Sequence, residues 1–227
     1  FPSDNPYRLL YAYAIVAAMD GVPMMMYGQE AGAKNDFTTY PSVGNANNNW
    51  SNYETNFGKS IPNFKRYNDM TAVWSNRDWT LQGLYNRVGW ARANSKALRS
   101  QKNYFLADKN TTVYDERIFA VAKFEEAGVP ADQQEVVFVF VNNDYEAAAS
   151  RAATFDLSAE VSPGINWFGI NPVHSYNLQN LLATNPTSNV WASNRSGTDL
   201  IQNGMYVGLN DPANTLGQAQ YLRLVRQ

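Results

Sequence analysis

The stretch Asp20-Gly-Val-Pro-Met-Met-Met-Tyr-Gly-Gln-Glu-Ala-Gly32 decides how the first part of the chain is interpreted. Its apolar run, residues 22–27, is short, does not alternate and is bounded by glycine, which is typical of a strand buried on both faces beneath helices. Two polar side chains, Gln29 and Glu30, follow the run, and α/β folds place ligand chemistry at the ends of such strands. A plain core strand followed by a turn explains the same pattern.

A helix is predicted on each side of this strand. In residues 7–18 apolar side chains recur at helical spacing and cover most of the circumference, so this helix should be packed on several sides. Residues 81–98 repeat the helical period, with Asp78 or Thr80 as the N-cap. The basic side chains of this second helix, Arg92 among them, are best explained by a solvated polar face.

The rest of the chain divides into a polar connection and a β-rich half. Residues 29–76 show little periodicity, and connections of that length inside a compact domain are usually functional or disordered. After Gln101 the apolar period changes to two. We predict strands there, separated by turn residues, at 104–106, 118–124, 135–142, 151–157, 205–209 and 219–225. Several short strands of this kind favour an antiparallel β-sandwich.

Composition argues against several functional classes. A net charge of −2 gives no reason to expect binding to nucleic acid or to an anionic membrane surface. The longest apolar stretch, residues 9–26, is interrupted by Asp20 and Pro23 and is not expected to span a bilayer. The chain contains no cysteine, which excludes disulfides and thiolate chemistry. No loop has the spacing of calcium ligands, so no metal site is predicted.

Several motifs resemble those of one enzyme family. Gly21-Val-Pro-Met-Met-Met-Tyr-Gly-Gln-Glu30 resembles the eighth-strand motif of the α-amylase family, glycoside hydrolase family 13. Phe1-Pro-Ser-Asp-Asn5 resembles the segment that follows the family's Asn-His-Asp motif on strand seven. Ala97-Leu-Arg-Ser100 resembles the end of the last barrel helix, and Tyr176-Asn-Leu-Gln-Asn-Leu-Leu-Ala-Thr184 resembles an edge of the family's C-terminal β-domain. The first three matches occur in the family's order.

This resemblance implies the C-terminal remnant of a (β/α)8 TIM barrel in residues 1–100, followed by an antiparallel β-sandwich domain in residues 101–227. The parent protein would be a retaining glycosidase acting on α-1,4-glucans such as starch and maltooligosaccharides. Its two reacting carboxyl groups and their supporting aspartate would all precede Phe1. The chain is therefore expected to contain no catalytic residue and to be inactive by itself.

The resemblance also implies where substrate would touch this chain. Gln29 and Glu30 would stand at the catalytic end of strand eight. Asn35 and Asp36 are similar to the end of a Gly-Gly-Asn-Asp motif that contacts glucose rings in fungal-type amylases, and an Asx-turn explains Asn35 equally well. Trp50 could stack on a pyranose face, although local packing is the simpler account of this ring.

The expected partners are the α-glucan substrate and the missing N-terminal barrel segment, with no nucleic acid and no membrane. No cofactor is expected in this chain, and a calcium ion would belong to the upstream part. The family resemblance implies an extracellular or periplasmic protein whose signal peptide is not in this chain.

One buried strand between two helices cannot close a barrel, so run 22–27 would expose an apolar edge. A different class of function, a non-catalytic carbohydrate-binding or scaffold module, stays open.

Overall fold

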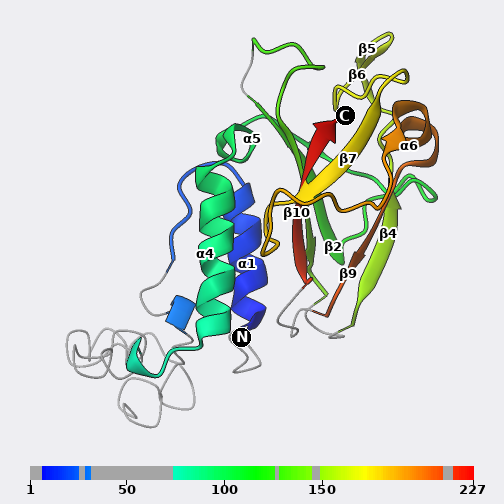
Figure 1. Cartoon of the computed structure of the whole chain (residues 1–227). Coiled ribbons are helices and arrows are strands. Elements are labelled where there is room, and N and C mark those ends of the chain that lie inside the picture. The colour runs from blue at the N-terminus through cyan, green and yellow to red at the C-terminus, as the bar shows by residue number, and fades with distance from the viewer. Residues whose placement is uncertain (1–6, 26–28, 32–73, 126–127, 145–148, 212–216) are drawn as a thin grey trace, which may run out of the picture.

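The fold consists mostly of antiparallel sheet with few helices, arranged in three layers (Figure 1). The computed structural model describes residues 7–25, 29–31, 74–125, 128–144, 149–211 and 217–227. A helical layer lies on one face of a six-stranded sheet, and a two-stranded sheet with a short helix lies on the other face. Every strand pair in the described residues is antiparallel, so the barrel remnant predicted for residues 1–100 is not confirmed.

The helical layer contains α1 (Tyr7–Ala18), α4 (Trp79–Ala93) and α5 (Lys96–Arg99). The prediction for α1 is confirmed over its whole length. The single helix predicted at 81–98 is interrupted after Ala93, because Ser95 leaves the helical conformation and caps α5 by accepting a hydrogen bond from the Leu98 amide. A 3-10 turn, η1 (Gln29–Ala31), lies beside α4.

The large sheet has the strand order β1-β2-β3-β10-β7-β8, and the smaller sheets are β4-β9 and β5-β6. The bounds are β1 (Asn103–Phe105), β2 (Ile118–Phe124), β3 (Val136–Asn142), β4 (Arg151–Phe155), β5 (Glu160–Ser162), β6 (Ile165–Asn166), β7 (Ser175–Asn180), β8 (Arg195–Ser196), β9 (Met205–Leu209) and β10 (Ala219–Arg226). The six predicted strands are all present, with ends that differ by at most two residues. Helix α6 (Gly197–Asn203) follows β8.

Strand β3 lies between β2 and β10 and separates two hydrophobic cores. Three of its valines, Val137, Val139 and Val141, belong to the core beneath the helices, together with Tyr85 and Leu98. Alternate residues of the strand point to the other face. Because β3 is buried on both faces, its sequence shows an unbroken apolar run without polar alternation.

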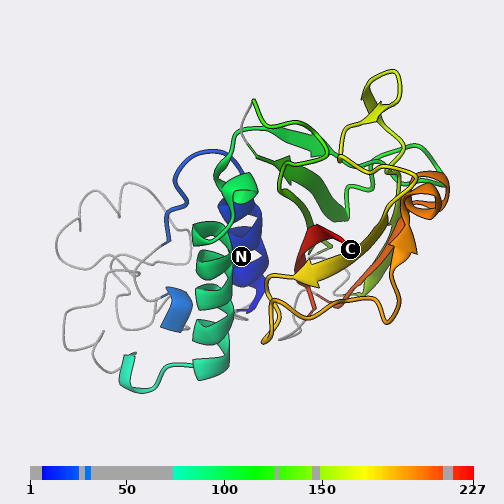
Figure 2. The same ribbon diagram turned by 45° about the horizontal axis from the view of Figure 1, so that its top comes forward.

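The second core fills the space between the six-stranded sheet and the β4–β9 pair (Figure 2). Phe138 and Phe140 of β3 are fully buried there. The Phe140 ring lies 4.7 Å from that of Phe155 on β4, and the Phe138 ring lies 5.6 Å from that of Phe168, measured between centroids. These tilted contacts join the two layers of the sandwich.

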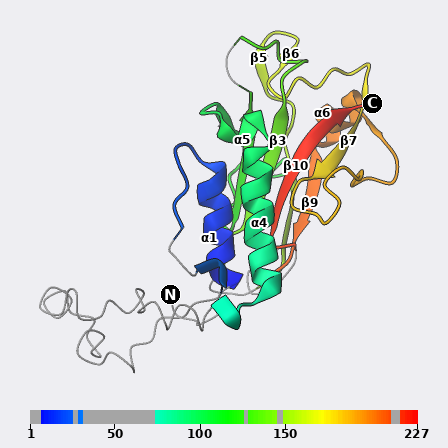
Figure 3. The same cartoon turned by 60° about the vertical axis from the view of Figure 1, so that its left-hand side comes forward.

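The predicted buried strand at 22–27 is wrong for its described part. Residues 22–25 form no ladder, and Val22 and Met24 are 87% and 86% exposed. The segment runs back along the helical layer, on the side away from the sheet (Figure 1, Figure 3). A strand needs a neighbour for its backbone N–H and C=O groups, and none of the described strands supplies one. Residues 26 and 27 lie outside the described residues.

Asp78 connects the N-terminal ends of the two long helices, α1 and α4. As predicted, its side chain caps α4, because Oδ1 accepts hydrogen bonds from the amides of Thr80 and Leu81 at 2.9 and 3.0 Å. The other carboxylate oxygen, Oδ2, accepts one from the Tyr7 hydroxyl on α1. The Tyr7 hydrogen bond is the largest cause that lowers the pKa of Asp78 below its ordinary value, and the two amide hydrogen bonds act in the same direction.

This cap predicts an acid-dependent loss of stability. A carboxyl group with a lowered folded-state pKa stabilises the fold above its unfolded value, 3.8, and that contribution is lost as the pH falls through the folded-state value. Asp78→Ala should therefore cost about 1 kcal/mol at pH 7 and progressively less below pH 3.8. Urea unfolding from pH 7 to pH 2 measures this. Asp78→Asn, which keeps an acceptor oxygen, should lose less at pH 7. A cost of Asp78→Ala that stays constant with pH would contradict the assignment.

Candidate functional site

The candidate site is built around η1, where the chain after the exposed segment returns to the helices. The Gln29 side chain donates a hydrogen bond through Nε2 to the hydroxyl of Tyr85 at 2.9 Å. Tyr85 is a buried residue of α4, and its ring centroid lies 5.0 Å from that of Tyr13 on α1. A tyrosine pair between the helices therefore fixes the position of Gln29.

Glu30 is the chemically notable residue of η1. Its Oε2 atom is buried and has no hydrogen-bond partner among the described residues. A buried acceptor left unsatisfied typically costs about 1–3 kcal/mol, and more when it is charged. The structure thus holds a carboxylate oxygen from which water is excluded and to which no donor is supplied by the described part of the chain.

The pKa values of both tyrosines are raised above their ordinary value. Burial is the main cause that raises the pKa of Tyr85, and the carboxylate of Glu30 adds to the rise while the hydrogen bond from Gln29 opposes it. Burial also raises the pKa of Tyr13, with Arg92 opposing and Glu30 adding to the rise. Both phenols therefore keep their protons at neutral pH.

Arg92 of α4 holds the chain that leads to this site. Its Nη1 atom donates to the carbonyl oxygens of Ala17 and Leu98, each at 2.7 Å, and of Met19 at 3.3 Å. Its Nη2 atom donates to the carbonyl oxygen of Gly21 at 2.5 Å. The Ala17 carbonyl lies in the last turn of α1, where carbonyl oxygens have no partner within the helix. The solvated face expected for Arg92 is therefore wrong, because its guanidinium group caps the end of α1.

The predicted substrate contacts are only partly described. Gln29 and Glu30 lie together on η1, whereas Asn35, Asp36 and Trp50 lie outside the described residues. The helical period predicted for residues 81–98 includes Tyr85, but the sequence did not connect this residue with Gln29. No periodic signal could have done so, since the contact joins residues that are 56 positions apart.

The chemistry that this site can perform follows from its groups. It offers one carboxylate, one carboxamide and two neutral phenols, which together can accept and donate hydrogen bonds to hydroxyl groups. Glycoside hydrolysis needs two carboxyl groups on opposite sides of one bond, and η1 supplies one. Within the described ranges no cluster of His, Cys, Asp and Glu could hold a metal ion. Those ranges also contain no helix that is both long and apolar enough to cross a membrane.

Comparison with known proteins gives similarity in structure only. A scan against models of protein families finds no match, and a search of curated proteins finds none. Among solved structures, trehalulose synthase from Pseudomonas mesoacidophila MX-45 matches 98% of this chain, with a TM-score of 0.46 and 12% identity. A variant of a trehalulose synthase, in complex with Tris, matches with a TM-score of 0.48 and 14% identity.

A pullulanase from Anoxybacillus sp. LM18-11 is also similar, over 96% of this chain, with a TM-score of 0.40 and 12% identity. This chain spans 38% of the length of the trehalulose synthases and 23% of that of the pullulanase.

Proposed function

We propose that this chain is the C-terminal part of an α-amylase-type retaining glycoside hydrolase that acts on α-1,4-glucans such as starch and maltooligosaccharides. In this proposal the chain supplies a loop of the substrate cleft and the β-domain, and the catalytic acids lie in an upstream barrel segment. The motif Gly21-Val-Pro-Met-Met-Met-Tyr-Gly-Gln-Glu30 supports it, because this motif resembles the family's eighth strand. An extracellular or periplasmic parent belongs to the same proposal.

The observation that carries the proposal is the exposure of the apolar segment before η1. Val22 and Met24 are almost fully exposed and Met25 is 39% exposed, although all three belong to an uninterrupted apolar run. Contiguous exposed apolar side chains typically mark a surface that another part of a protein covers. Parallel strands of an upstream barrel segment would pair with this run and bury it on both faces.

The groups of η1 fit a place at the rim of such a barrel. Gln29 is held by Tyr85, and Glu30 has a buried oxygen that accepts no hydrogen bond from the described residues. A sugar hydroxyl, or a donor from the upstream segment, would satisfy that oxygen. We include Asn35, Asp36 and Trp50 among the proposed substrate contacts on the strength of the resemblance.

Hydrolysis assays test this proposal. The chain alone should release no reducing ends from soluble starch, because in this proposal both reacting carboxyl groups lie in the upstream barrel segment. The longer parent should release them, and should lose that activity when its strand-seven aspartate is replaced by asparagine. A purified, monomeric chain of this length that degrades starch unaided would overturn the proposal.

The second candidate is a non-catalytic carbohydrate-binding or scaffold module. The solvent-exposed aromatic residues of the β-rich half favour it, since Tyr114 and Phe105 are 63% and 46% exposed. A parent without hydrolytic activity, together with glycan binding by the isolated chain, would select this alternative.

A further inference from the structure

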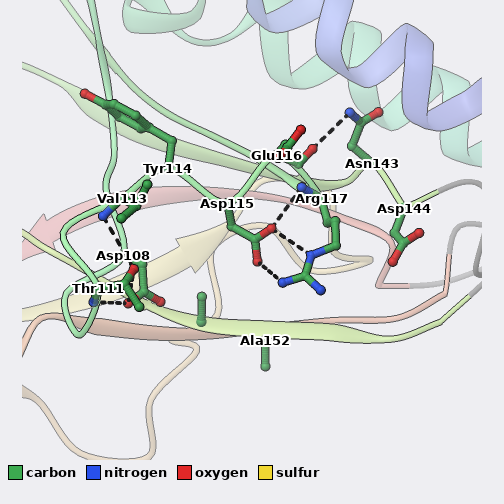
Figure 4. A pocket seen from close by; sticks show the side chains of 11 residues that line it. Asp108, Thr111, Val113, Tyr114, Asp115, Glu116, Arg117, Asn143, Asp144 and Ala152 are labelled. Atoms are coloured by element: carbon green, nitrogen blue, oxygen red, sulfur yellow. Dashed lines mark hydrogen bonds and ion pairs between the residues drawn. The ribbon is translucent and has the colours of Figure 1, made fainter.

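A cavity of about 1010 Å³ opens in the β-rich half, away from η1 (Figure 4). It lies between the loop at 108–117, the residues that follow β3, and β4, where Ala152 and Ala153 contribute little bulk. A neighbouring hollow of about 450 Å³ shares Tyr114, Glu116 and other lining residues with it. Hollows of this size suit a small ligand or a few units of a polymer.

Tyr114 stands at one side of this cavity as an exposed ring (Figure 4). It is 63% exposed, and the preceding Val113 is 59% exposed. Thr112 has φ of +57°, and it is the only non-glycine residue with positive φ in the described ranges. Such a conformation costs about 1–3 kcal/mol and persists only where surrounding contacts impose it. Here the Thr112 amide donates to the Asp108 carbonyl at 2.8 Å, which holds the loop in place.

The polar groups beside Tyr114 are held in fixed orientations. Arg117 donates to both carboxylate oxygens of Asp115, from Nε at 3.0 Å and from Nη2 at 3.2 Å (Figure 4). Asn143 donates through Nδ2 to the Glu116 carbonyl at 3.4 Å, so its amide also points along the cavity wall. Because these planar groups are already oriented, a ligand that binds them would lose little further side-chain entropy.

Most of the charges around the cavity are compensated. Asp115 pairs with Arg117, and Asp144 pairs with Arg151. Asp108 accepts hydrogen bonds from the backbone amides of its own turn. Among the carboxylates that line the cavity, only the Glu116 side chain makes no hydrogen bond within the described residues. The four lining carboxylates outnumber the two arginines that pair with them, so the cavity carries an excess of negative charge, which disfavours a polyanion and is compatible with an uncharged polar ligand.

We propose that this cavity binds a neutral oligosaccharide, with a pyranose ring stacked on Tyr114 and its hydroxyl groups bonded by Asp115, Glu116 and Asn143. Sugar rings present an apolar C–H face to an aromatic ring and a rim of hydroxyl groups that both donate and accept hydrogen bonds. A flat exposed ring, an oriented carboxylate, a second carboxylate without a hydrogen bond from the described residues, an amide and a guanidinium together match both features. The assignment of an α-1,4-glucan as the particular ligand rests on the proposed function, whereas the assignment of a saccharide does not.

Calorimetric titration of the isolated chain tests the site, with maltoheptaose as the α-1,4-linked probe and cellohexaose as a β-linked comparison. The wild type should bind maltoheptaose, and Tyr114→Ala should weaken this binding about tenfold or more. Tyr206→Ala is the matched control, because Tyr206 is 67% exposed on β9 and does not line the cavity. It should leave affinity unchanged. Circular dichroism verifies that both variants keep the fold.

The outcomes separate this inference from the proposed function. Binding of cellohexaose in place of maltoheptaose, still weakened by Tyr114→Ala, would support the saccharide site and remove support for an α-1,4-glucan. Starch hydrolysis by the parent, with no saccharide bound by the isolated chain, would overturn the site and leave the proposed function standing. Equal losses in the Tyr114 and Tyr206 variants would also overturn the site.

Discussion

The Arg92→Met variant is expected to lose about 2–4 kcal/mol of unfolding free energy, because it removes the donor from several carbonyl oxygens at once. Ala17 and Leu98 are both fully buried, and each accepts from the Arg92 guanidinium at 2.7 Å. Methionine fills a similar volume but donates nothing, so these acceptors become unsatisfied. Urea unfolding followed by tryptophan fluorescence measures the loss.

Two further variants show whether the guanidinium group is responsible for that loss. Arg87 lies on the same helix and makes one hydrogen bond, to the Leu182 carbonyl at 3.3 Å. Arg87→Met should therefore cost less than about 1 kcal/mol. Arg92→Lys, which keeps the charge without the planar fork of donors, should fall between the two. If Arg92→Met is no less stable than Arg87→Met, the capping of α1 by Arg92 contributes nothing measurable.

The second large effect is expected only in the longer parent that we propose. Met24 is 86% exposed in this chain, so Met24→Asp should change its stability by no more than about 0.5 kcal/mol. In the parent, where the proposed barrel buries this residue, the same change places a charge in an apolar interior and should cost several kcal/mol. Thermal unfolding of both proteins, with and without the substitution, measures the difference.

Val173 provides the control for that comparison. It is 81% exposed in the β-rich half, in the turn before β7, and no barrel contact is proposed for it. Val173→Asp should be tolerated equally in the isolated chain and in the parent. A parent that tolerates Met24→Asp as well as Val173→Asp would show that the segment at 22–25 is not covered by an upstream partner.

Elements that depend on local sequence could be predicted, and those that depend on distant partners could not. The helical period of residues 7–18 and the two-residue period of β9 specify the element by themselves. Strand β7 was not predicted as a strand, because it carries polar residues inside a sheet. Its Asn177 is 1% exposed, and its side chain is satisfied by Trp191 and Asn194, which lie on a later loop.

The strand predicted at 22–27 is incorrect for a different reason: its residues are apolar, as a buried strand requires, but they lack a partner. An apolar run favours burial, but a residue is buried only where another part of the protein covers it. The described residues do not cover Val22 or Met24. The division at Ser100 and the roles of the five proposed substrate contacts remain predictions. The Tyr114 cavity could not have been found from periodicity, because it combines a loop, the end of β3 and the face of β4.

The burial of the Lys123 amine offers a way to detect movement of the helical layer. This side chain has no exposed surface, and its Nζ atom lies 2.9 Å from the carboxylate of Asp20, which follows α1. An acylating reagent should therefore modify the solvent-facing lysines quickly and reach Lys123 only when α1 lifts from the sheet. The rate at which mass spectrometry detects that single acylated amine would report the opening of the helical layer, without any mutation or attached probe.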